Sequence, residues 1–415
     1  MTVPETVVGL DLGTTKISAI IAEVGDDDEV QVVGVGVTPS NGMRRGVVVN
    51  IEKTSEAIRE AVDLAEQMAG ANVRNVFAGI GGDTIRSINS RGVIAVSRTQ
   101  PAGRGNIISP YDVERVIERA REIALPSDRQ ILHVLPQGFT VDNETGIKDP
   151  VSITGMRLEA DVHIITGQVA SSENIYRCIK NAGANLRELV LQPLASSYAV
   201  LSDSEKDLGV CLIDIGGGTT DIIVFYEGAI RHTAVIGLGG QNVTRDVAMV
   251  LGIPMDSAEK LKVERGGLFS PLPDTPPIKV EPVGEWKGRE VDAVELNAII
   301  QARMDEVFRL VARELKRVEL FDSIPAGIVL TGGASLLKGS TRLAEDIFRR
   351  PVRIGYPRGL NGLADTVHSP AYATGVGLIL YALRNGSSMP AEKRPKGAFT
   401  GVFSSIRGMF EGLIA

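Results

Sequence analysis

The sequence predicts an α/β protein made of two related domains, because one pattern of strands and turns occurs twice. The first copy is VVGLDLGTTKISAII at residues 7–21, and the second is VCLIDIGGGTTDIIVF at residues 210–225. Each copy reads as an apolar strand, a Gly/Thr turn and a second apolar strand, which is typical of a β-hairpin. An internal repeat of this kind indicates a duplicated fold.

The two copies can be aligned residue by residue. Asp11 aligns with Asp214, Gly13 with Gly216, and Thr14-Thr15 with Thr219-Thr220, after a two-residue insertion in the second copy. Each copy continues into a third strand-like run, at 30–37 and 229–239, and then into a helix, at Lys53 to Met68 and Asn242 to Val250. We therefore expect two α/β domains that face each other across a cleft, with both hairpin tips pointing into it.

Other segments complete the expected organisation. Residues 84–165 read as a small α+β insertion with one helix, capped by Ser109 and starting at Pro110. Residues 264–290 are rich in Pro and Gly and predict a loop or short hairpin, followed by a long helix over 293–317. The expected parts are a first domain (1–83, 166–205 and 366–384), the insertion (84–165), a second domain (206–365), a polar tether (385–397) and a terminal helix (398–415).

The composition excludes some classes of protein. A net charge of −7 argues against a nucleic-acid binder, which usually carries a basic face. Cys178 and Cys211 lie in apolar patterns and read as core residues, and the four histidines show no metal-ligand spacing. No signal peptide and no apolar run long enough to span a bilayer is found, so a cytosolic chain is expected.

The glycine turns are suited to binding phosphate groups. Backbone N–H groups converge at such turns, and glycine leaves room for a ligand oxygen. The threonines of both tips add hydroxyl donors, and Lys16 adds a positive charge. Because Asp11 and Asp214 would repel a bare triphosphate, we expect a Mg²⁺ ion between them and the phosphates, held through its water shell. A third turn, TGGAS at 331–335, would let the backbone approach adenine or ribose. A single such turn could be an ordinary β-turn, but three in this order favour nucleotide binding.

These motifs are similar to known ones. DLGTTK, IDIGGGTTD and VLTGGAS resemble the two phosphate motifs and the adenosine motif of the actin, sugar-kinase and DnaK-chaperone superfamily. Over nearly the whole length, the chain more closely resembles the bacterial cell-division family FtsA, through ILHVLPQGFTVDN, ELVLQPLASSYAVL and AIRHTAVIGLGGQNVTRD. The resemblance implies an actin-like, duplicated ribonuclease-H-like two-domain ATPase fold, with an α+β insertion subdomain and a C-terminal amphipathic helix.

The resemblance also implies a ligand, partners and a location. The family binds ATP with Mg²⁺, polymerises head to tail and ties the tubulin-like protein FtsZ to the inner face of the cytoplasmic membrane at the division site. The implied partners are the FtsZ C-terminal tail, further copies of the chain, membrane lipids and other division proteins, with no nucleic acid. The implied nucleotide-binding positions are Asp11, Gly13, Thr14, Thr15, Lys16, Asp214, Gly216, Gly217, Gly218, Thr219, Thr220, Gly239, Gly240, Glu259, Lys262, Gly332, Gly333 and Ala334. Arg303 matches a position on the surface that binds the FtsZ tail.

Hydrolysis would need a group that orients a water molecule in line with the γ-phosphate. Gln192, in LQPLASS, matches the position of that group in the superfamily, although it could instead cap the helix that follows. Glutamine is a poor general base, and no further carboxylate can be assigned to the cleft. We therefore expect ATP binding with at most slow hydrolysis. A sugar kinase or a pilus- or rod-type scaffold remains an alternative, but no sugar motif is found.

The end of the chain has an amphipathic pattern. Its apolar residues recur at helical spacing and are Phe399, Val402, Phe403, Ile406, Met409, Phe410, Leu413 and Ile414. Such a helix could dock on its own body, bind a partner helix or lie in a membrane interface, and its length and amphipathic character favour the membrane. One helix would bind weakly, whereas a filament carrying many would bind well through avidity.

Overall fold

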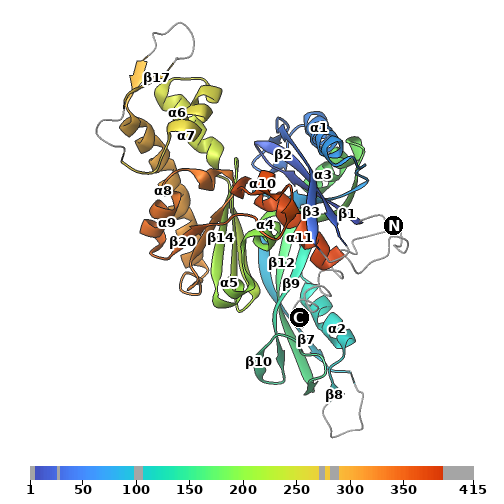
Figure 1. Ribbon diagram of the computed structural model, residues 1–415. Helices are drawn as coiled ribbons and strands as arrows, with labels where there is room; N and C mark the ends of the chain where they lie inside the picture. The colour runs from blue at the N-terminus through green and yellow to red at the C-terminus, as the bar shows by residue number, and fades with distance from the viewer. Residues whose placement is uncertain (1–4, 26–28, 98–105, 271–275, 281–288, 387–415) are drawn as a thin grey trace.

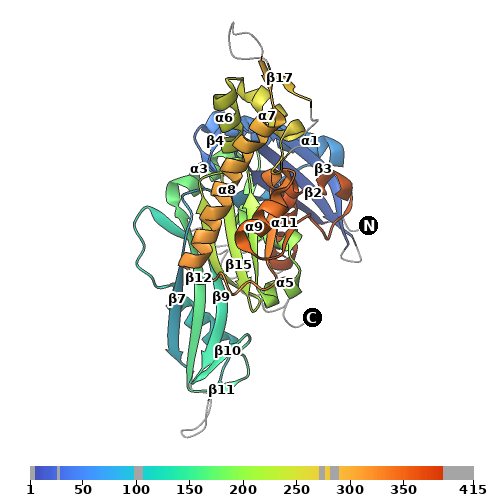
Figure 2. The same cartoon turned by 90° about the vertical axis from the view of Figure 1, so that its left-hand side faces the viewer.

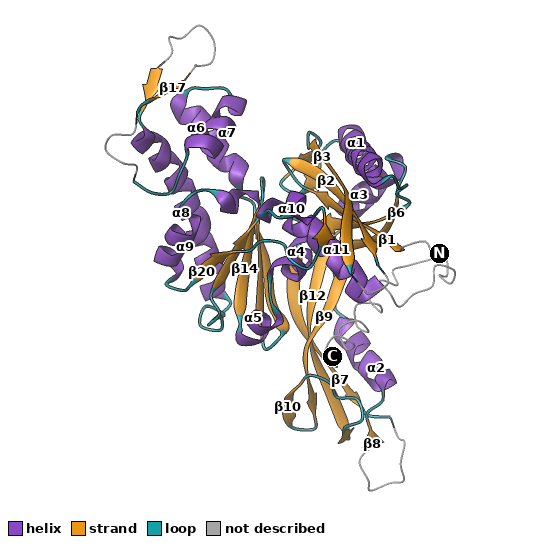
Figure 3. Cartoon of the chain, in the orientation of Figure 1, coloured by secondary structure: helices purple, strands orange, loops and turns teal. Residues whose placement is uncertain are grey.

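The computed structural model describes residues 5–25, 29–97, 106–270, 276–280 and 289–386. Two mixed β-sheets with flanking helices make up the body of the molecule, and a third sheet extends away from it (Figure 1). Figure 3 shows that strands form the centre of each unit and that helices lie outside them. The α/β fold class expected from the sequence is confirmed.

The first sheet has six strands in the spatial order β13-β6-β1-β2-β3-β21. These are β1 (Glu5–Leu12), β2 (Lys16–Val24), β3 (Val30–Pro39), β6 (Asn75–Ile80), β13 (Asn185–Leu191) and β21 (Asn361–Gly362). β1, β2 and β3 are antiparallel, whereas β6 and β13 run parallel to β1. One face packs against α1 (Ile51–Ala69), which lies beside α3 (Val169–Asn181), and the other against α4 (Gln192–Val200) and α11 (Ala373–Gly386).

The second sheet repeats this arrangement in the order β16-β15-β14-β19-β20. Its strands are β14 (Val210–Ile215), β15 (Thr220–Tyr226), β16 (Ala229–Ile236), β19 (Ile328–Thr331) and β20 (Val352–Ile354). Its helices are α5 (Asp203–Leu208), α6 (Gly240–Leu251), α7 (Met255–Arg265), α8 (Ala293–Arg317) and α9 (Ser340–Phe348). Again three antiparallel strands are followed by two parallel ones, so the duplication predicted from the sequence is confirmed.

The two sheets share part of their apolar core. Residues such as Leu212 and Ile223 of the second sheet belong to the same buried cluster as Ile20 of the first. The opposite face of the second sheet forms a separate cluster with α6, α8 and α9, which includes Val247 and Phe308. Because one core is continuous between the sheets, the domains are held side by side (Figure 1).

The two hairpins have turns of equal length. Asp11 pairs with Ser18 across β1 and β2, and Asp214 pairs with Asp221 across β14 and β15. The same turn hydrogen bond closes both tips, from Gly13 N to Lys16 O and from Gly216 N to Thr219 O, each at 3.0 Å. The expected two-residue insertion is therefore wrong. Matching the Thr-Thr pairs suggested it, but the backbone ladder instead makes Lys16 equivalent to Thr219 and Ser18 equivalent to Asp221.

The insertion is a four-stranded sheet in the order β10-β9-β12-β7, with a helix packed on it. Its elements are β7 (Arg86–Ala95), β8 (Asn106–Ile107), α2 (Pro110–Arg121), β9 (Arg129–Val141), β10 (Glu144–Ile147), β11 (Thr154–Gly155) and β12 (Arg157–Gln168). Ser109 caps α2 and Pro110 begins it, as predicted. Figure 2 shows that this subdomain lies at one end of the molecule, and that α6 and α7 lie at the other end.

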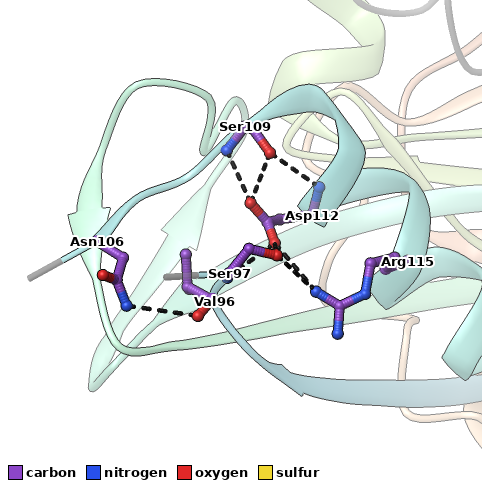
Figure 4. Close-up of polar contacts among 6 residues, drawn as sticks. All are labelled: Val96, Ser97, Asn106, Ser109, Asp112 and Arg115. Carbon is purple, nitrogen blue, oxygen red and sulfur yellow. Dashed lines mark hydrogen bonds and ion pairs between the residues drawn. The ribbon is translucent and has the colours of Figure 1, made fainter. Parts of the chain in front are cut away.

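A buried carboxylate organises the start of α2. Asp112 accepts hydrogen bonds from the backbone N–H and the hydroxyl groups of both Ser97 and Ser109, and it pairs with Arg115 at 3.2 Å (Figure 4). Burial acts to raise the pKa of Asp112, but these hydrogen bonds outweigh it and lower the pKa to about 2. The ionised side chain therefore joins the end of β7 to α2.

The insertion also contacts the second domain. His163 on β12 lies 3.0 Å from Thr233 Oγ1 on β16, and Ser87 on β7 donates to the Thr233 carbonyl at 2.9 Å. Gln137 on β9 donates to the carbonyl of Ile230 at 2.7 Å. The subdomain is therefore inserted into the chain of the first domain. Its side chains also contact β16, the edge strand of the second domain.

The remaining elements are short. They are β4 (Met43–Arg44), β5 (Val47–Val48), the hairpin of β17 (Ile278–Val280) and β18 (Arg289–Val291), the 3-10 helices η1 (Gly333–Leu336) and η2 (Pro370–Tyr372), and α10 (Ala364–Val367). The β17–β18 hairpin and the bounds of α8 agree with the sequence predictions. α11 extends to Gly386 and so includes the first two residues of the expected tether. The predicted terminal helix and its eight apolar residues lie outside the described residues.

Candidate nucleotide-binding site

A pocket of about 440 Å³ lies between the two hairpin tips, η1 and α7. Most residues singled out in the sequence line it. They are Asp11, Gly13, Thr14, Thr15, Lys16, Gln192, Asp214, Gly216, Gly217, Gly218, Thr219, Gly240, Glu259, Lys262, Gly332, Gly333 and Ala334. Three others do not line it: Thr220, Gly239 and Arg303. The structure thus brings three glycine turns, far apart in the chain, to one cavity.

The hairpin tips touch each other at the floor of the pocket. A Cβ atom on Gly217 would lie 2.3 Å from Thr15 Cγ2, and one on Gly218 would lie 2.6 Å from Thr14 Oγ1. Thr14 Oγ1 in turn accepts a hydrogen bond from Gly46 N at 3.0 Å. Glycine is needed at both positions because the tips approach more closely than a side chain would allow.

Two of the expected residues support the second tip from behind. Thr220 is the first residue of β15, and its hydroxyl donates to the carbonyl of Leu238 at 2.8 Å. Gly239 caps α6, and a Cβ there would lie 2.6 Å from Gly216 O. The N-terminus of α6 donates through Gly240 N to Gly216 O at 2.9 Å. Thr220 therefore supplies no donor to the cavity, because strand alternation turns it away from Thr219.

Three buried carboxylates gather at the floor. Burial raises the pKa of Asp11 and of Asp214 to about 6 each, against the opposing effects of Lys16 on Asp11 and of Ser196 on Asp214. Burial, and then the charge of Asp214, raises the pKa of Asp221 to about 7. Asp221 Oδ1 is buried without a hydrogen-bond partner, while Oδ2 accepts from Thr219. The floor therefore carries more negative charge than the protein balances.

Sequence reasoning missed Asp221, since it assigned no further carboxylate to the cleft. Asp221 ends the motif IDIGGGTTD and is the direct cross-strand partner of Asp214, so its side chain shares a face with Asp214. If the two strands that flank the glycine turn had been paired residue by residue, starting at the turn, Asp221 would have been placed opposite Asp214. The mistaken two-residue insertion hid that symmetry.

Lys16 is held at the rim by an aromatic ring. Its ammonium lies 3.5 Å from the ring centroid of Tyr372 in η2. Burial lowers the pKa of Lys16, and the charge of Asp11 opposes the decrease. A cation over a ring face is stabilised by the ring quadrupole, so Tyr372 fixes the only charged donor of the first tip.

Gln192 points to the floor of the pocket. Its Nε2 donates to Asp11 Oδ1 at 3.2 Å and to the carbonyl of Leu12 at 3.3 Å. A Cβ on Gly81 would lie 2.1 Å from Gln192 Oε1, so glycine there leaves the amide its space. Leu191 is the N-cap residue of α4 and Gln192 is its first helical residue, so the Gln192 amide is directed to Asp11 and Leu12 rather than to the start of the helix.

The far end of the pocket combines an ion pair with apolar side chains. Lys262 Nζ donates to Glu259 Oε2 at 2.7 Å, to Thr244 Oγ1 at 3.0 Å and to Gly240 O at 3.3 Å. The apolar lining there is Val263, Leu336 and Leu337. The apolar lining suits a flat, weakly polar group, and the ion pair suits hydroxyl groups beside it.

The donor set fits a hydrated cation. Within the described residues, no group of three or more His, Cys, Asp or Glu side chains forms a metal site of its own. The unpartnered Oδ1 of Asp221 and the raised pKa values of the three aspartates instead indicate charge that a Mg²⁺ ion could balance. Mg²⁺ keeps several waters, so Asp11 and Asp214 would hold it through water beside phosphate oxygens.

Arg303 lies on α8, away from the pocket. Its guanidinium pairs with Asp246 at 2.6 Å and with Glu306, and the side chain is 25% exposed.

Among the described helices, none is both long and apolar enough to cross a membrane.

Two family models match the chain. "Cell division protein FtsA" matches residues 211–377, and "SHS2 domain inserted in FTSA" matches residues 82–166. The chain is 46% identical to Cell division protein FtsA of Pseudomonas aeruginosa, over 92% of this chain and 90% of that protein. It is 36% identical to the Escherichia coli K12 protein of the same name, over 93% and 92% of the two chains.

Solved structures show the same fold at low identity. The PilM-PilN type IV pilus biogenesis complex matches with a TM-score of 0.66 and 16% identity, covering 90% of this chain and 97% of that chain. MreB5 of Spiroplasma citri bound to ADP matches with a TM-score of 0.54 and 15% identity, covering 90% and 94%. The MamK double helical filament matches with a TM-score of 0.51 and 13% identity, covering 93% and 99%. The fold is thus actin-like, and at 36–46% identity to curated relatives the chain belongs to the FtsA family of cell division proteins.

Proposed function

We propose that this cell division protein binds Mg·ATP in the pocket between its hairpins, and that nucleotide controls its assembly into filaments. The observation that carries the proposal is the convergence of three glycine turns and three aspartates on one cavity of about 440 Å³. Lys16 and the backbone N–H groups of both tips would bind the phosphates. The cavity end near Val263 and Leu336 would take the base. The structural relatives include MreB5 bound to ADP and the MamK double helical filament.

Nucleotide binding is tested by equilibrium titration of the full chain with a fluorescent ATP analogue, with Mg²⁺ or with EDTA. The control variant is Gly217→Ala, whose added Cβ would meet Thr15 at 2.3 Å. Binding of the wild type and its loss in the variant support the site. Equal binding by both proteins would place the ligand elsewhere, and absence of binding by either would overturn the proposal.

Hydrolysis is proposed to be slow. Gln192 is the residue positioned to orient water, and an amide cannot remove its proton. The three aspartates are buried, and a cation bound beside them would lower their affinity for a proton and so weaken them as bases. Gln192→Ala should then further reduce the low turnover measured at saturating Mg·ATP, where a change in affinity has no effect.

The chain is proposed to anchor FtsZ filaments to the inner face of the cytoplasmic membrane, as a peripheral protein. The amphipathic pattern over 399–414 supports membrane binding. Arg303 is the candidate contact for the FtsZ tail, and an acidic tail would have to compete with Asp246 for its guanidinium. Arg303→Ala should weaken co-sedimentation with FtsZ, whereas Arg309→Ala, on the same helix and paired only with Asp305, should not.

The anchor is tested by liposome flotation, with the full chain and a form ending at Gly397, each with and without Mg·ATP. Flotation of the full chain alone, increased by Mg·ATP, supports an anchor whose strength depends on assembly. Equal flotation of both forms, or of neither, would show that the terminal segment is not the anchor.

A further inference from the structure

A chain of three polar side chains runs through the pocket floor, where Asp214 and Thr374 line the pocket and Ser196 does not. Ser196 Oγ donates to Asp214 Oδ2 at 2.7 Å, and Thr374 Oγ1 lies 3.0 Å from the Ser196 oxygen. All three side chains are buried, and Ser196 is fully so. A serine hydroxyl has one proton, which Ser196 gives to Asp214. Within this pair Thr374 is then the donor, and a side-chain hydrogen bond from Thr374 also lowers the pKa of Asp214.

The three residues come from three different elements. Asp214 ends β14 in the second sheet, Ser196 lies on α4 and Thr374 lies on α11. α4 and α11 pack on the first sheet. The hydrogen bond between Ser196 and Asp214 therefore crosses from the helices of one domain to the sheet of the other.

The same helix also holds the matching carboxylate of the first hairpin. Gln192 and Ser196 are four residues apart on α4, so they lie one above the other on one face. Gln192 Nε2 donates to Asp11 Oδ1 at 3.2 Å, and Ser196 Oγ donates to Asp214 Oδ2. One face of α4 thus sets the positions of two aspartates that belong to opposite halves of the fold.

The second oxygen of Asp214 faces the third glycine turn. A Cβ on Gly332 would lie 2.4 Å from Asp214 Oδ1, so backbone closes on that oxygen from the side of the third glycine turn. The terminal torsion of an aspartate is broad and roughly two-fold, so it is fixed only when a partner selects one oxygen. Ser196 makes that selection.

We infer that Ser196, oriented by Thr374, is a positioning residue that fixes Asp214 for the hydrated Mg²⁺ of the nucleotide complex. The inference rests on the proposed nucleotide-binding function and assigns the metal-dependent part of binding to a residue that does not line the pocket. Gln192 donates to Asp11 from the same face of α4, so one helix contacts both carboxylates.

The test separates metal-dependent from metal-independent binding. The affinity of the full chain for a fluorescent ATP analogue is measured in EDTA and across a Mg²⁺ titration. Ser196→Ala should raise the half-saturating Mg²⁺ concentration roughly ten-fold, because the Asp214 carboxylate loses a charge-assisted hydrogen bond. Affinity in EDTA should change less than about two-fold. Thr374→Val, which keeps the shape of the side chain, should shift the Mg²⁺ requirement in the same direction by roughly three-fold.

Ser197→Ala is the matched control. Ser197 is the next residue of α4 and is equally buried, but its hydroxyl donates to Leu194 O within its own helix. It should leave the Mg²⁺ requirement unchanged. A wild-type Mg²⁺ requirement in Ser196→Ala, or an equal loss of affinity in EDTA, would overturn the positioning role while leaving nucleotide binding intact. If the wild type itself binds no nucleotide, the proposed function fails, and this inference fails with it.

Discussion

Asp221 lies directly across the β14–β15 ladder from Asp214, at the place where Ser18 lies across from Asp11 in the first hairpin. Both Asp221 Oδ1 and Ser18 Oγ are buried without a hydrogen-bond partner. A buried hydroxyl without a partner costs less than a buried carboxylate beside a second one. A fold tolerates such a group when a ligand offsets its charge, so Asp221 points to a cation-dependent ligand.

Replacing the Asp221 carboxylate should therefore stabilise the free protein and impair its ligand binding. Asp221→Asn removes repulsion from Asp214 and Asp11, and should raise the melting temperature without ligand by about 2–4 °C. The same variant should weaken Mg²⁺-dependent nucleotide binding roughly ten-fold. Calorimetric melting and titration measure the two effects, and Ser18→Ala should leave Mg²⁺-dependent nucleotide binding unchanged. A destabilised Asp221→Asn would contradict the electrostatic account.

Two neighbouring glycines in the third turn should respond differently to alanine. Gly332 has φ of 81° and ψ of 162°, a conformation essentially reserved for glycine, and its added Cβ would meet Asp214. Gly332→Ala should lower the free energy of unfolding by roughly 3 kcal/mol or more. An added Cβ on Gly333 meets nothing closer than Ala371 Cβ at 3.8 Å. Gly333→Ala should stay within about 0.5 kcal/mol of the wild type in denaturant melts. Similar losses in both variants would show that the turn fails for another reason.

The ring of Tyr372 should matter and its hydroxyl should not. Tyr372→Leu removes the face that holds the Lys16 ammonium, and should weaken triphosphate binding roughly three- to ten-fold, from a contact worth about 0.5–2 kcal/mol. Tyr372→Phe keeps the ring and should bind like the wild type. Titration calorimetry decides between them, and tighter binding by Tyr372→Leu would mean that the ring competes with phosphate for Lys16.

The Asp112 cluster should give the insertion an acid-sensitive stability. The pKa of Asp112 is about 2 when folded and 3.8 as a free side chain, so its ionised form stabilises the fold above pH 3.8. That contribution, roughly 2 kcal/mol, is lost as the pH falls from 3.8 through 2. Asp112→Asn should therefore be less stable than the wild type at pH 7, and the difference should shrink between pH 4 and pH 2 in urea melts. A difference that is constant with pH would mean that the charge of Asp112 contributes nothing.

His163 should couple the insertion to the second domain through its ring contact with Thr233. Burial lowers the pKa of His163 to about 3, so at pH 7 one ring nitrogen donates and the other accepts between Asn89 and Thr233. His163→Leu should increase hydrogen exchange along β16, where His232 and Thr233 lie, without changing exchange in β1. His368→Leu, at a histidine outside the insertion, is the comparison. Unchanged exchange in β16 would show that the contacts of Ser87 and Gln137 suffice.

Much of the fold follows from the sequence because local signals agree. Strand alternation and the repeated glycine turns predict both hairpins, and the bounds of α8 follow from its caps and apolar spacing. Other features depend on how distant parts of the chain pack together, which local sequence patterns do not predict. The contact between Lys16 and Tyr372 joins opposite ends of the sequence, and the outward turn of Thr220 depends on strand register. Asp221 was missed because residue identity, rather than the hydrogen-bond ladder, set the alignment of the two turns.

The equal length of the two hairpin turns affects the direction in which a ligand can bind. If the two turns, here called the arms of the pocket, were identical, an elongated anion could bind between them in either direction. Here the arms match in backbone but not in charge, because one offers the ammonium of Lys16 where the other has Thr219, and one offers Ser18 where the other has Asp221. The two arms therefore present chemically different ends to a ligand, and an elongated anion can bind in one direction only.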